Sequence, residues 1–260
     1  MTWRIHHKAE TASTNLDARG GSHGDVFTAD FQTAGRGRLD HKWLSPPRTN
    51  LMMSVVLSVA GLSPEHIATL PLVAGLAVVK AVGSDVLGRS QPPENEDSVL
   101  HRLRAARRSA PTVQLKWPND VLIDGRKISG ILCERSGDTV IVGIGVNVGQ
   151  TEFDKEIADR ATSLALLSHA GVFRLRSSVL SLRDSILAEL DNWYSLWRAD
   201  GFAAVRPEIA AVDFLKGRTV TVRQTDDDVA PIVGVSNGIM EDGSLDVGGV
   251  KVFAGEAHVE

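Results

Sequence analysis

The sequence predicts an α+β protein in which helices pack against a β-sheet, followed by a small all-β unit at the C-terminus. Three observations support this fold class. Up to residue 198, strand-like segments are interspersed with two helical patterns of spacing three and four. From Gly217 onward, short strand patterns separated by turn residues replace the helical spacing. The length of 260 residues exceeds the roughly 100 to 200 residues of a usual domain, so we expect two units, residues 1–212 and 213–260.

Composition is that of an ordinary soluble protein and excludes several classes. Hydrophobic residues make up 43% and charged residues 23% of the sequence, which excludes disorder over the whole length. The formal net charge of -4 provides no overall basic field for nucleic acid. Residues 1–8 contain no apolar signal segment, and the apolar run at 72–79 is far shorter than the ~20 residues that span a bilayer. We therefore expect a cytoplasmic protein without membrane or DNA contacts.

The triplet Ser13-Thr14-Asn15 stands before a short helical pattern that Gly20-Gly21 ends. These residue types are favoured N-caps because their side-chain oxygens accept hydrogen bonds from unpaired backbone N–H groups. By itself, the triplet predicts a helix cap and needs no further function.

A loop rich in glycine and arginine follows the next strand pattern. Residues 26–31 alternate as a strand does and lead through Gln32 into the loop 33–42. Arginine forks suit bidentate phosphate contacts, and glycines allow backbone N–H groups to crowd around an anion. A solvated basic loop and an Arg-Gly nucleic-acid contact remain open as alternatives. The loop has too much glycine and charge to pack by itself, so we expect it to be mobile without a ligand.

The next segments predict a buried strand, a helix and a solvated insertion. Residues 51–59 form an apolar run typical of a strand that is covered on both faces. Ser63-Pro64-Glu65 is a helix-start signal, and the apolar spacing behind it predicts one helix on the sheet, kinked at Pro71. Residues 89–111 place an acidic block beside a basic block, which is typical of a solvated insertion.

The most informative stretch, residues 115–134, predicts two strands joined by a tight turn at Asp124-Gly125. Asp-Gly supplies the positive φ angles of a type I′ hairpin. Lys127 follows just past this turn, and the small pair Ser129-Gly130 lets a ligand approach the backbone closely. Cys133, the single cysteine, cannot form an internal disulfide, and its strand-like surroundings predict a buried, inert thiol.

Residues 139–148 predict a further strand, and residues 177–198 predict the longest helix. Gly143-x-Gly145 is not a dinucleotide fingerprint, because neither a third glycine nor a helix follows it. Glycines that permit close packing in a central strand are the simpler interpretation. Trp193 and Trp197 fall on the apolar stripe of the helix, so we assign both to packing.

The C-terminal segment predicts five short strands in about 44 residues, an arrangement typical of a small barrel. Residues 218–223 alternate, and turn residues occur at 226–228 and 241–244. Only a dozen residues precede Ser13, so we expect no helix-turn-helix ahead of it.

Motifs spread along the chain give it a specific resemblance. Lys116-Trp-Pro-Asn-Asp120 is followed by Lys127-Ile-Ser-Gly-Ile-Leu132. Gln32-Thr-Ala-Gly-Arg-Gly-Arg38, with Trp43 behind it, lies upstream, and Gly143-Ile-Gly-Val-Asn147 lies downstream. In this order and spacing, the sequence from about Ser13 to the C-terminus resembles the biotin protein ligases, or biotin–(acetyl-CoA-carboxylase) ligases, in a short form without an N-terminal DNA-binding domain.

The resemblance implies a fold and an activity. The implied fold is a class II synthetase-like biotin/lipoate ligase catalytic domain, with helices packed on a mixed sheet, followed by an SH3-like β-barrel. The implied activity is ATP-dependent activation of biotin to biotinyl-5′-AMP and transfer of biotin to a specific lysine of a biotin carboxyl carrier domain of acetyl-CoA carboxylase or a related carboxylase. ATP and biotin are the implied substrates and Mg²⁺ the implied metal. Homodimers are common in the family, so a homodimer is a candidate assembly.

The resemblance also implies roles for individual residues. Lys127, Arg36 and Arg38 are the expected catalytic residues, with Lys127 holding the biotin carboxylate and the α-phosphate together. Asp120 either orients Lys127 or helps to hold Mg²⁺, and Trp43 either stacks on adenine or anchors the loop. The expected biotin-binding residues are Ser13, Thr14, Asn15, Gln32, Gly35, Arg36, Gly37, Arg38, Lys127 and Gly130. The expected residues for ATP and adenylate are Arg38, Trp43, Lys116, Asn119, Asp120, Lys127 and Asn147.

The chain departs from the family pattern at Asp40 and His41, where glycine and a basic residue are frequent. One cation fewer and an added carboxylate put the pyrophosphate contacts in question, but not the adenylate contacts. Two other functions remain as alternatives: a lipoate-protein ligase, which shares the fold and the lysine, and a noncatalytic biotin or nucleotide sensor. The motifs at 32–38 and 116–120 match the biotin ligases better.

Overall fold

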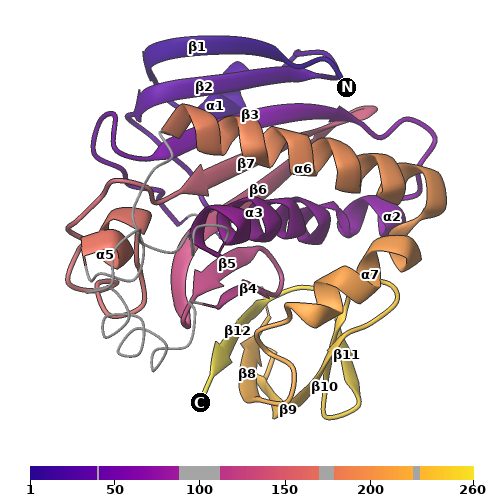
Figure 1. Cartoon of the computed structure of the whole chain (residues 1–260). Coiled ribbons are helices and arrows are strands. Elements are labelled where there is room, and N and C mark those ends of the chain that lie inside the picture. The colour runs from indigo at the N-terminus through magenta and orange to yellow at the C-terminus, as the bar shows by residue number, and fades with distance from the viewer. Residues whose placement is uncertain (40, 88–111, 170–178, 225–228) are drawn as a thin grey trace, which may run out of the picture.

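A seven-stranded sheet forms the centre of the protein (Figure 1). The computed structural model describes residues 1–39, 41–87, 112–169, 179–224 and 229–260. The strand order is β1-β2-β3-β7-β6-β5-β4; β1 and β2 are parallel and the other neighbours antiparallel, which confirms the predicted mixed sheet. The strands are β1 (Arg4–Thr11), β2 (Asp25–Gln32), β3 (Leu51–Ser58), β4 (Val113–Lys116), β5 (Asp120–Ile123), β6 (Arg126–Ser136) and β7 (Thr139–Val146).

The predicted hairpin is confirmed at its turn and corrected in its first arm. Asp124 and Gly125 have φ angles of 49° and 78°, the left-handed conformation for which Asp-Gly is suited. The residues before this turn form two strands instead of one: β4 and β5 pair with each other across a bend that contains a cis Trp117–Pro118 bond. Proline has no N–H for a strand ladder, so the extended pattern ends there. No pattern predicts β1, because its side chains are almost all exposed and show no apolar alternation.

Helices α3 and α6 lie together over one face of the sheet (Figure 1). The single kinked helix predicted after Ser63 is in fact two helices, α2 (Pro64–Ala68) and α3 (Leu70–Leu87). Ser63 Oγ accepts a hydrogen bond from His66 N at 3.2 Å, as the cap signal predicts. Pro71 lies in the first turn of α3, where its missing N–H leaves no hydrogen bond unmade, so it starts a helix instead of kinking one.

The second helical pattern is confirmed by α6 (Val179–Asp200). Trp197 is fully buried and its Nε1 donates to Thr69 Oγ1 at 2.8 Å, which ties α6 to the start of α3. Residues 177 and 178 of this prediction and the insertion at 89–111 lie outside the described residues. The remaining helices are α1 (Thr14–Asp17), α5 (Leu164–His169) and α7 (Phe202–Ala211).

One helical stretch in the described part of the chain is long and apolar enough to cross a membrane. It is Pro64–Ser84, with a mean hydropathy of 1.8, and 72% of it is buried inside the molecule. A helix that is apolar all round is also typical of a protein core. This stretch contacts both the sheet and α6, so it is part of the protein core.

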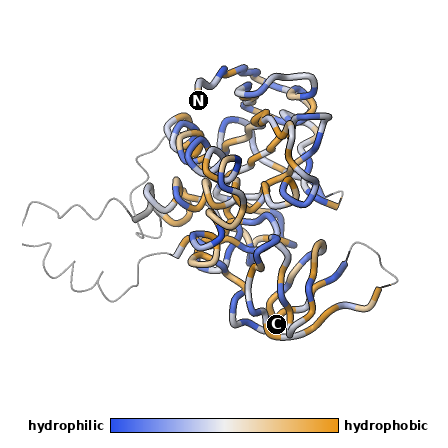
Figure 2. Tube along the Cα trace, turned by 90° about the vertical axis from the view of Figure 1, so that its right-hand side faces the viewer, coloured by the Kyte–Doolittle hydropathy of each residue, from blue (hydrophilic) through white to orange (hydrophobic). Residues whose placement is uncertain are grey.

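The C-terminal strands form a second, five-stranded antiparallel sheet of order β11-β10-β9-β8-β12. This confirms the predicted number of short strands, and the sheet is not closed into a barrel. Trp117 Nε1 donates to Gly243 O at 3.0 Å, so the two sheets share a buried contact. The chain ends lie on opposite sides of the molecule, the N-terminus by the first sheet and the C-terminus by the second (Figure 2). The strands are β8 (Thr219–Arg223), β9 (Ile232–Ile239), β10 (Leu245–Val247), β11 (Val250–Val252) and β12 (Glu256–Val259).

Candidate active site

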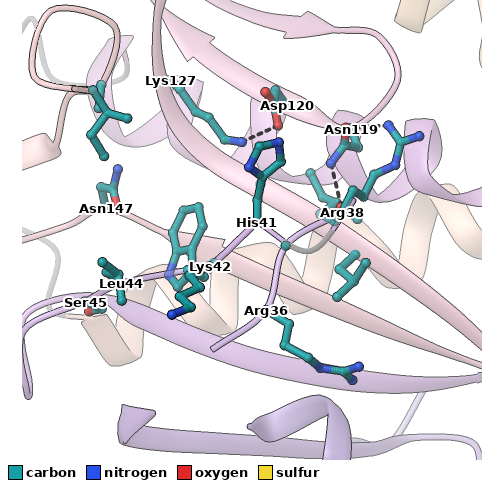
Figure 3. Close-up of a pocket in the computed structure, with 18 of the residues that line it drawn as sticks. Arg36, Arg38, His41, Lys42, Leu44, Ser45, Asn119, Asp120, Lys127 and Asn147 are labelled. Atoms are coloured by element: carbon teal, nitrogen blue, oxygen red, sulfur yellow. Dashed lines mark hydrogen bonds and ion pairs between the residues drawn. The ribbon is translucent and has the colours of Figure 1, made fainter. Parts of the chain in front are cut away.

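A cavity of about 1070 Å³ opens between the two sheets and is partly covered by the glycine-arginine loop (Figure 3). Its walls come from segments far apart in sequence: α1, the ends of β5, β6 and β7, residues 150–161, and β12 of the second sheet. The structure brings nearly all of the predicted site residues to this one cavity. Those on its lining are Ser13, Thr14, Asn15, Gln32, Arg36, Gly37, Arg38, Trp43, Lys116, Asn119, Asp120, Lys127, Gly130 and Asn147.

Lys127 stands on a rigid part of the wall. Its N–H donates to Arg160 O at 2.8 Å and its carbonyl accepts from Thr162 N at 2.9 Å, so the backbone is held on the side away from β5 as well. The ammonium lies 2.7 Å from Asp120 Oδ1 (Figure 3), with 38% of the side chain exposed. Because hydrogen bonds hold the backbone of Lys127 and a carboxylate holds its ammonium, the ammonium is preorganised to bind an anion that enters the cavity.

Further cations surround Lys127. Lys116 lies half-buried on the cavity wall, where burial lowers its pKa, Asp120 partly offsets this, and Lys127 and Arg160 lower it further. The pKa of His258 is lowered by burial and then by Lys116. Within the described chain, neither Lys116 nor Arg160 has a carboxylate within ion-pair distance. Desolvated cations that repel one another are stabilised by an anion between them, so this wall suits a polyphosphate.

The opposite end of the cavity carries a network of uncharged polar groups. Thr14 donates to Gln32 Oε1 from its backbone N at 2.8 Å and from Oγ1 at 3.0 Å. The buried Ser54 Oγ lies 2.7 Å from Thr14 Oγ1 and 2.6 Å from Asn15 Oδ1. Ser13 occupies the N-cap position of α1, but its side chain makes no capping hydrogen bond. The prediction of a helix cap is therefore confirmed for the position of Ser13 but not for its hydrogen bonding. All three residues of the triplet line the cavity.

The glycine-arginine loop folds back on itself over the cavity. Trp43 N donates to Gly35 O at 3.0 Å, and Gly37 N donates to His41 O at 2.6 Å. A Cβ on Gly35 would lie 2.4 Å from Trp43 O, so the return of the chain requires glycine there. The predicted mobility of this loop stays a prediction.

The two arginines of the loop point in different directions (Figure 3). Arg38 Nη1 donates to Asn119 Oδ1 at 3.2 Å, and burial lowers the pKa of its guanidinium. Arg36 turns away from Lys127, and its Nη2 lies 2.7 Å from Glu134 Oε2 on β6. Arg38 therefore faces the cation wall, whereas the Arg36 guanidinium is engaged elsewhere.

Comparison with known proteins agrees with this geometry. Residues 6–150 match the Biotin/lipoate A/B protein ligase family. The chain belongs to this family. It is 34% identical to the biotin–(acetyl-CoA-carboxylase) ligase of Mycobacterium tuberculosis, over 98% of this chain and 88% of that protein.

Solved structures of biotin protein ligases have the same fold. The Aquifex aeolicus enzyme in complex with biotin and ATP superposes with a TM-score of 0.76 at 28% identity, covering 98% of both chains. The Leishmania major enzyme in complex with biotinyl-5-AMP gives a TM-score of 0.64 at 26% identity, again covering 98% of both.

Two glycines of this ligase chain, Gly143 and Gly145, are packed closely against side chains of the site. A Cβ on Gly145 would lie 2.5 Å from Cε2 of the Trp43 indole, and one on Gly143 would lie 2.3 Å from Asn15 Oδ1. These glycines thus make room for site side chains, as the close-packing interpretation predicts. The Trp43 Nε1 is buried without a hydrogen-bond partner in the described structure, so the indole retains an unused donor.

Asn147 makes hydrogen bonds within the protein. Its Nδ2 donates to Thr162 O at 3.1 Å, and its backbone N donates to Ile128 O at 2.8 Å. These bonds fix residues 161–162 against β6 beside Lys127. The prediction that Asn147 meets adenine or ribose stays a prediction.

Sequence reasoning missed several side chains at or behind the site. Arg160 and His258 lie on the cavity lining but belong to no recognised motif, and Ser54 is hidden in an apolar strand. Glu134 ends the predicted hairpin without a distinguishing pattern. Cys133 is half-buried and not fully buried as predicted, but desolvation raises the pKa of its thiol to about 12, so it stays protonated and inert.

Proposed function

We propose that this protein is a biotin ligase that joins biotin to ATP as biotinyl-5′-AMP and passes the biotinyl group to a lysine of a biotin carboxyl carrier domain. The observation that carries the proposal is the cavity: a fixed ammonium at its centre, a polyphosphate-binding wall on one side and an uncharged polar pocket on the other. It lies in a chain that matches biotin–(acetyl-CoA-carboxylase) ligases over nearly its whole length and the fold of a ligase in complex with biotin and ATP.

In the first step, a biotin carboxylate oxygen attacks the α-phosphorus of ATP and pyrophosphate leaves. Two anions must meet, and Lys127 holds the carboxylate and an α-phosphate oxygen together while negative charge grows at phosphorus. Asp120 keeps the ammonium aimed at the cavity through their 2.7 Å contact. Arg38 joins Lys127 on the adenylate, and loop residues 35–38 cover the intermediate and exclude water.

The leaving pyrophosphate faces the unpaired cations. Lys116, and Arg160 beside it, neutralise the β- and γ-phosphates from the wall. These two cations compensate for the basic residue that is frequent in the family at positions 40 and 41, where this sequence has Asp and His.

Mg²⁺ fits this site as a companion of ATP. It binds through one or two carboxylates plus phosphate oxygens and keeps several waters. In the part of the chain that the structure describes, no three His, Cys, Asp or Glu side chains gather as a metal site. Of the two carboxylates that act on Lys116 of the wall, Asp120 has the larger effect and Glu256 the smaller. Asp120 would hold the ion, which would neutralise phosphate charge.

The polar pocket receives the ureido ring of biotin. Ser13, Thr14, Asn15 and Gln32 supply hydroxyl and amide groups on one side, while Gly130 lets the ligand approach β6. Trp43 and Asn147 contact the adenosine, with the unused indole N–H as one donor. Asn119 keeps Arg38 in place.

In the second step, a lysine amine of the carrier domain attacks the acyl carbon of the mixed anhydride and AMP leaves. Residues 1–212 would form the catalytic unit and residues 213–260 the second unit, whose open five-stranded sheet takes the place of the SH3-like barrel of the family and lines the cavity through β12. The protein would act in the cytoplasm without DNA contacts, with a homodimer as its candidate assembly.

The proposal is tested by incubating the purified protein with ATP and either biotin or lipoate, followed by mass spectrometry of the acyl adenylates. Biotinyl-5′-AMP with pyrophosphate is the expected product. Lipoyl adenylate as the main product would favour a lipoate ligase, and binding without any adenylate would favour the sensor.

A further inference from the structure

Glu134 links two predicted site residues that come from different segments. Its Oε2 accepts hydrogen bonds from Asn15 Nδ2 at 2.6 Å and from Arg36 Nη2 at 2.7 Å. Its Oε1 lies 3.8 Å from Arg19 Nη2. Asn15 belongs to α1 in the pocket, and Arg36 belongs to the loop over the cavity. One carboxylate on the rigid strand β6 therefore holds both.

The Asn15 side of this link is fixed. Asn15 is 4% exposed, and its Oδ1 accepts from Ser54 Oγ at 2.6 Å. Gly143 on the neighbouring strand leaves no space for Asn15 to shift toward the sheet. Movement of Glu134 would thus break bonds within the pocket, and a ligand that bonds to Asn15 adds to the network that holds Glu134.

The Arg36 end of the link can move more easily than the Asn15 end. Thr33 and Ala34, at the start of the loop, are held by backbone bonds to residues 11 and 12. Beyond them the loop contacts the body of the protein through side chains of Arg36, Arg38 and His41, the last 3.2 Å from Glu256. The Arg36 side chain is 40% exposed, and it points away from Lys127 and Arg38 (Figure 3). A guanidinium in this position contacts neither of the groups that surround the reacting phosphate.

We propose that Glu134 is a positioning residue that couples closure of the loop to occupation of the biotin pocket, and that the Arg36 guanidinium acts through Glu134 and not on the adenylate. Charge-assisted hydrogen bonds are stronger than neutral ones, so the shared carboxylate makes the two segments depend on each other. Such coupling is reciprocal: biotin tightens the loop, and a closed loop tightens biotin. This inference rests on the proposed ligase function.

The pair is tested by neutralising each partner and then both together. Glu134→Gln and Arg36→Gln are each expected to raise the KM for biotin roughly tenfold or more, with a smaller change in kcat, and to speed hydrogen exchange of loop amides at 33–39. The double variant Arg36→Gln with Glu134→Gln should lose no more than Glu134→Gln alone, because the guanidinium acts through that carboxylate. Glu10→Gln, the same chemical change on the exposed strand β1, is the matched control and should change neither.

Three results would overturn the inference. One is a double variant whose losses are the sum of the two single losses, because independent side chains behave in that way. Another is an Arg36→Gln variant that lowers kcat with an unchanged KM for biotin and unchanged exchange, because that is the signature of a group touching the reacting phosphate. The third is biotin binding that leaves loop exchange unaltered in the native protein.

Failure of the proposed function has a different signature. Native protein that makes no biotinyl adenylate would refute the function. Hydrogen exchange measured without ligand on Glu134→Gln and on the double variant would still report whether the carboxylate holds the loop.

Discussion

The two sides of the cavity are built in different ways. The wall around Lys127 is held by backbone hydrogen bonds to Arg160 and Thr162 and by the ladder of β6 with β5 and β7. Beyond Ala34, whose backbone is bonded to residue 12, the loop opposite is held to the body mainly by side chains of Arg36, Arg38 and His41. A backbone ladder keeps charge in one place, whereas side-chain contacts open at little cost. From this difference we expect the wall to carry out the chemistry and the loop to retain the intermediate.

Removing the charge on the wall should have the largest effect. Lys127→Ala is expected to slow pyrophosphate release from biotin and ATP by at least roughly 100-fold, because no other group replaces the fixed ammonium at phosphorus. Lys251→Ala, an exposed lysine of the second sheet paired with Asp242, is the control. Normal turnover by Lys127→Ala would place the chemistry elsewhere.

Adding a single methyl group should damage the polar pocket next. In Gly143→Ala the new Cβ meets Asn15 Oδ1 at 2.3 Å, and relief of the overlap should cost about 1–3 kcal/mol of unfolding free energy as well as biotin affinity. Gly83→Ala is the matched control, since a Cβ there meets nothing within 4 Å. Denaturant unfolding and biotin titration measure both effects. An equal response of the two variants would show that the pocket is not tightly packed.

A change on the loop should alter retention of the intermediate more than its formation. Arg38→Gly removes the contact with Asn119, so adenylate should still form, within roughly tenfold of the native rate, and then escape. Labelling of lysines on an added bystander protein measures the escape. Loss of adenylate formation to the extent seen for Lys127→Ala would mean that the loop shares the chemistry of the wall.

Low pH should lower the stability of the sheet edge formed by β1 and β2. Burial raises the pKa of Asp25, but hydrogen bonds from His6, Ser22 N and Arg4 outweigh it and hold the pKa at about 2, below the ordinary 3.8. The folded-state pKa is depressed, so this stabilisation is present above pH 3.8 and is lost as the pH falls toward 2. Asp25→Asn should therefore lower stability slightly at pH 7 and flatten the acid dependence in that window. An unchanged stability profile would show that Asp25 does not hold β1.

The wall was easier to predict from sequence than the loop contacts. Asp124-Gly125 specifies a turn by local backbone preference, and the turn places Lys127 at the head of β6 whatever surrounds it. The division of the first arm into β4 and β5, and of one helix into α2 and α3, depends on where Trp117 and Thr69 find partners in the folded chain. The spacing of apolar residues does not encode that.

The roles of the two arginines show the same difference. Arg36 and Arg38 lie in the same glycine-arginine motif, and the family resemblance implies that both contact the substrate. Their separation depends on Glu134 and Asn119, which are 98 and 81 residues away along the chain. Similarly, Arg160 and His258 reach the cavity only through the packing of residues 150–161 and of the second sheet.

A crystal structure with biotin and a nonhydrolysable ATP analogue tests the assignment of chemistry to the wall most directly. The account predicts Lys127 Nζ within about 3 Å of both a biotin carboxylate oxygen and an α-phosphate oxygen, with the β6 backbone unmoved. An ammonium that remains on Asp120 and contacts neither ligand would contradict it.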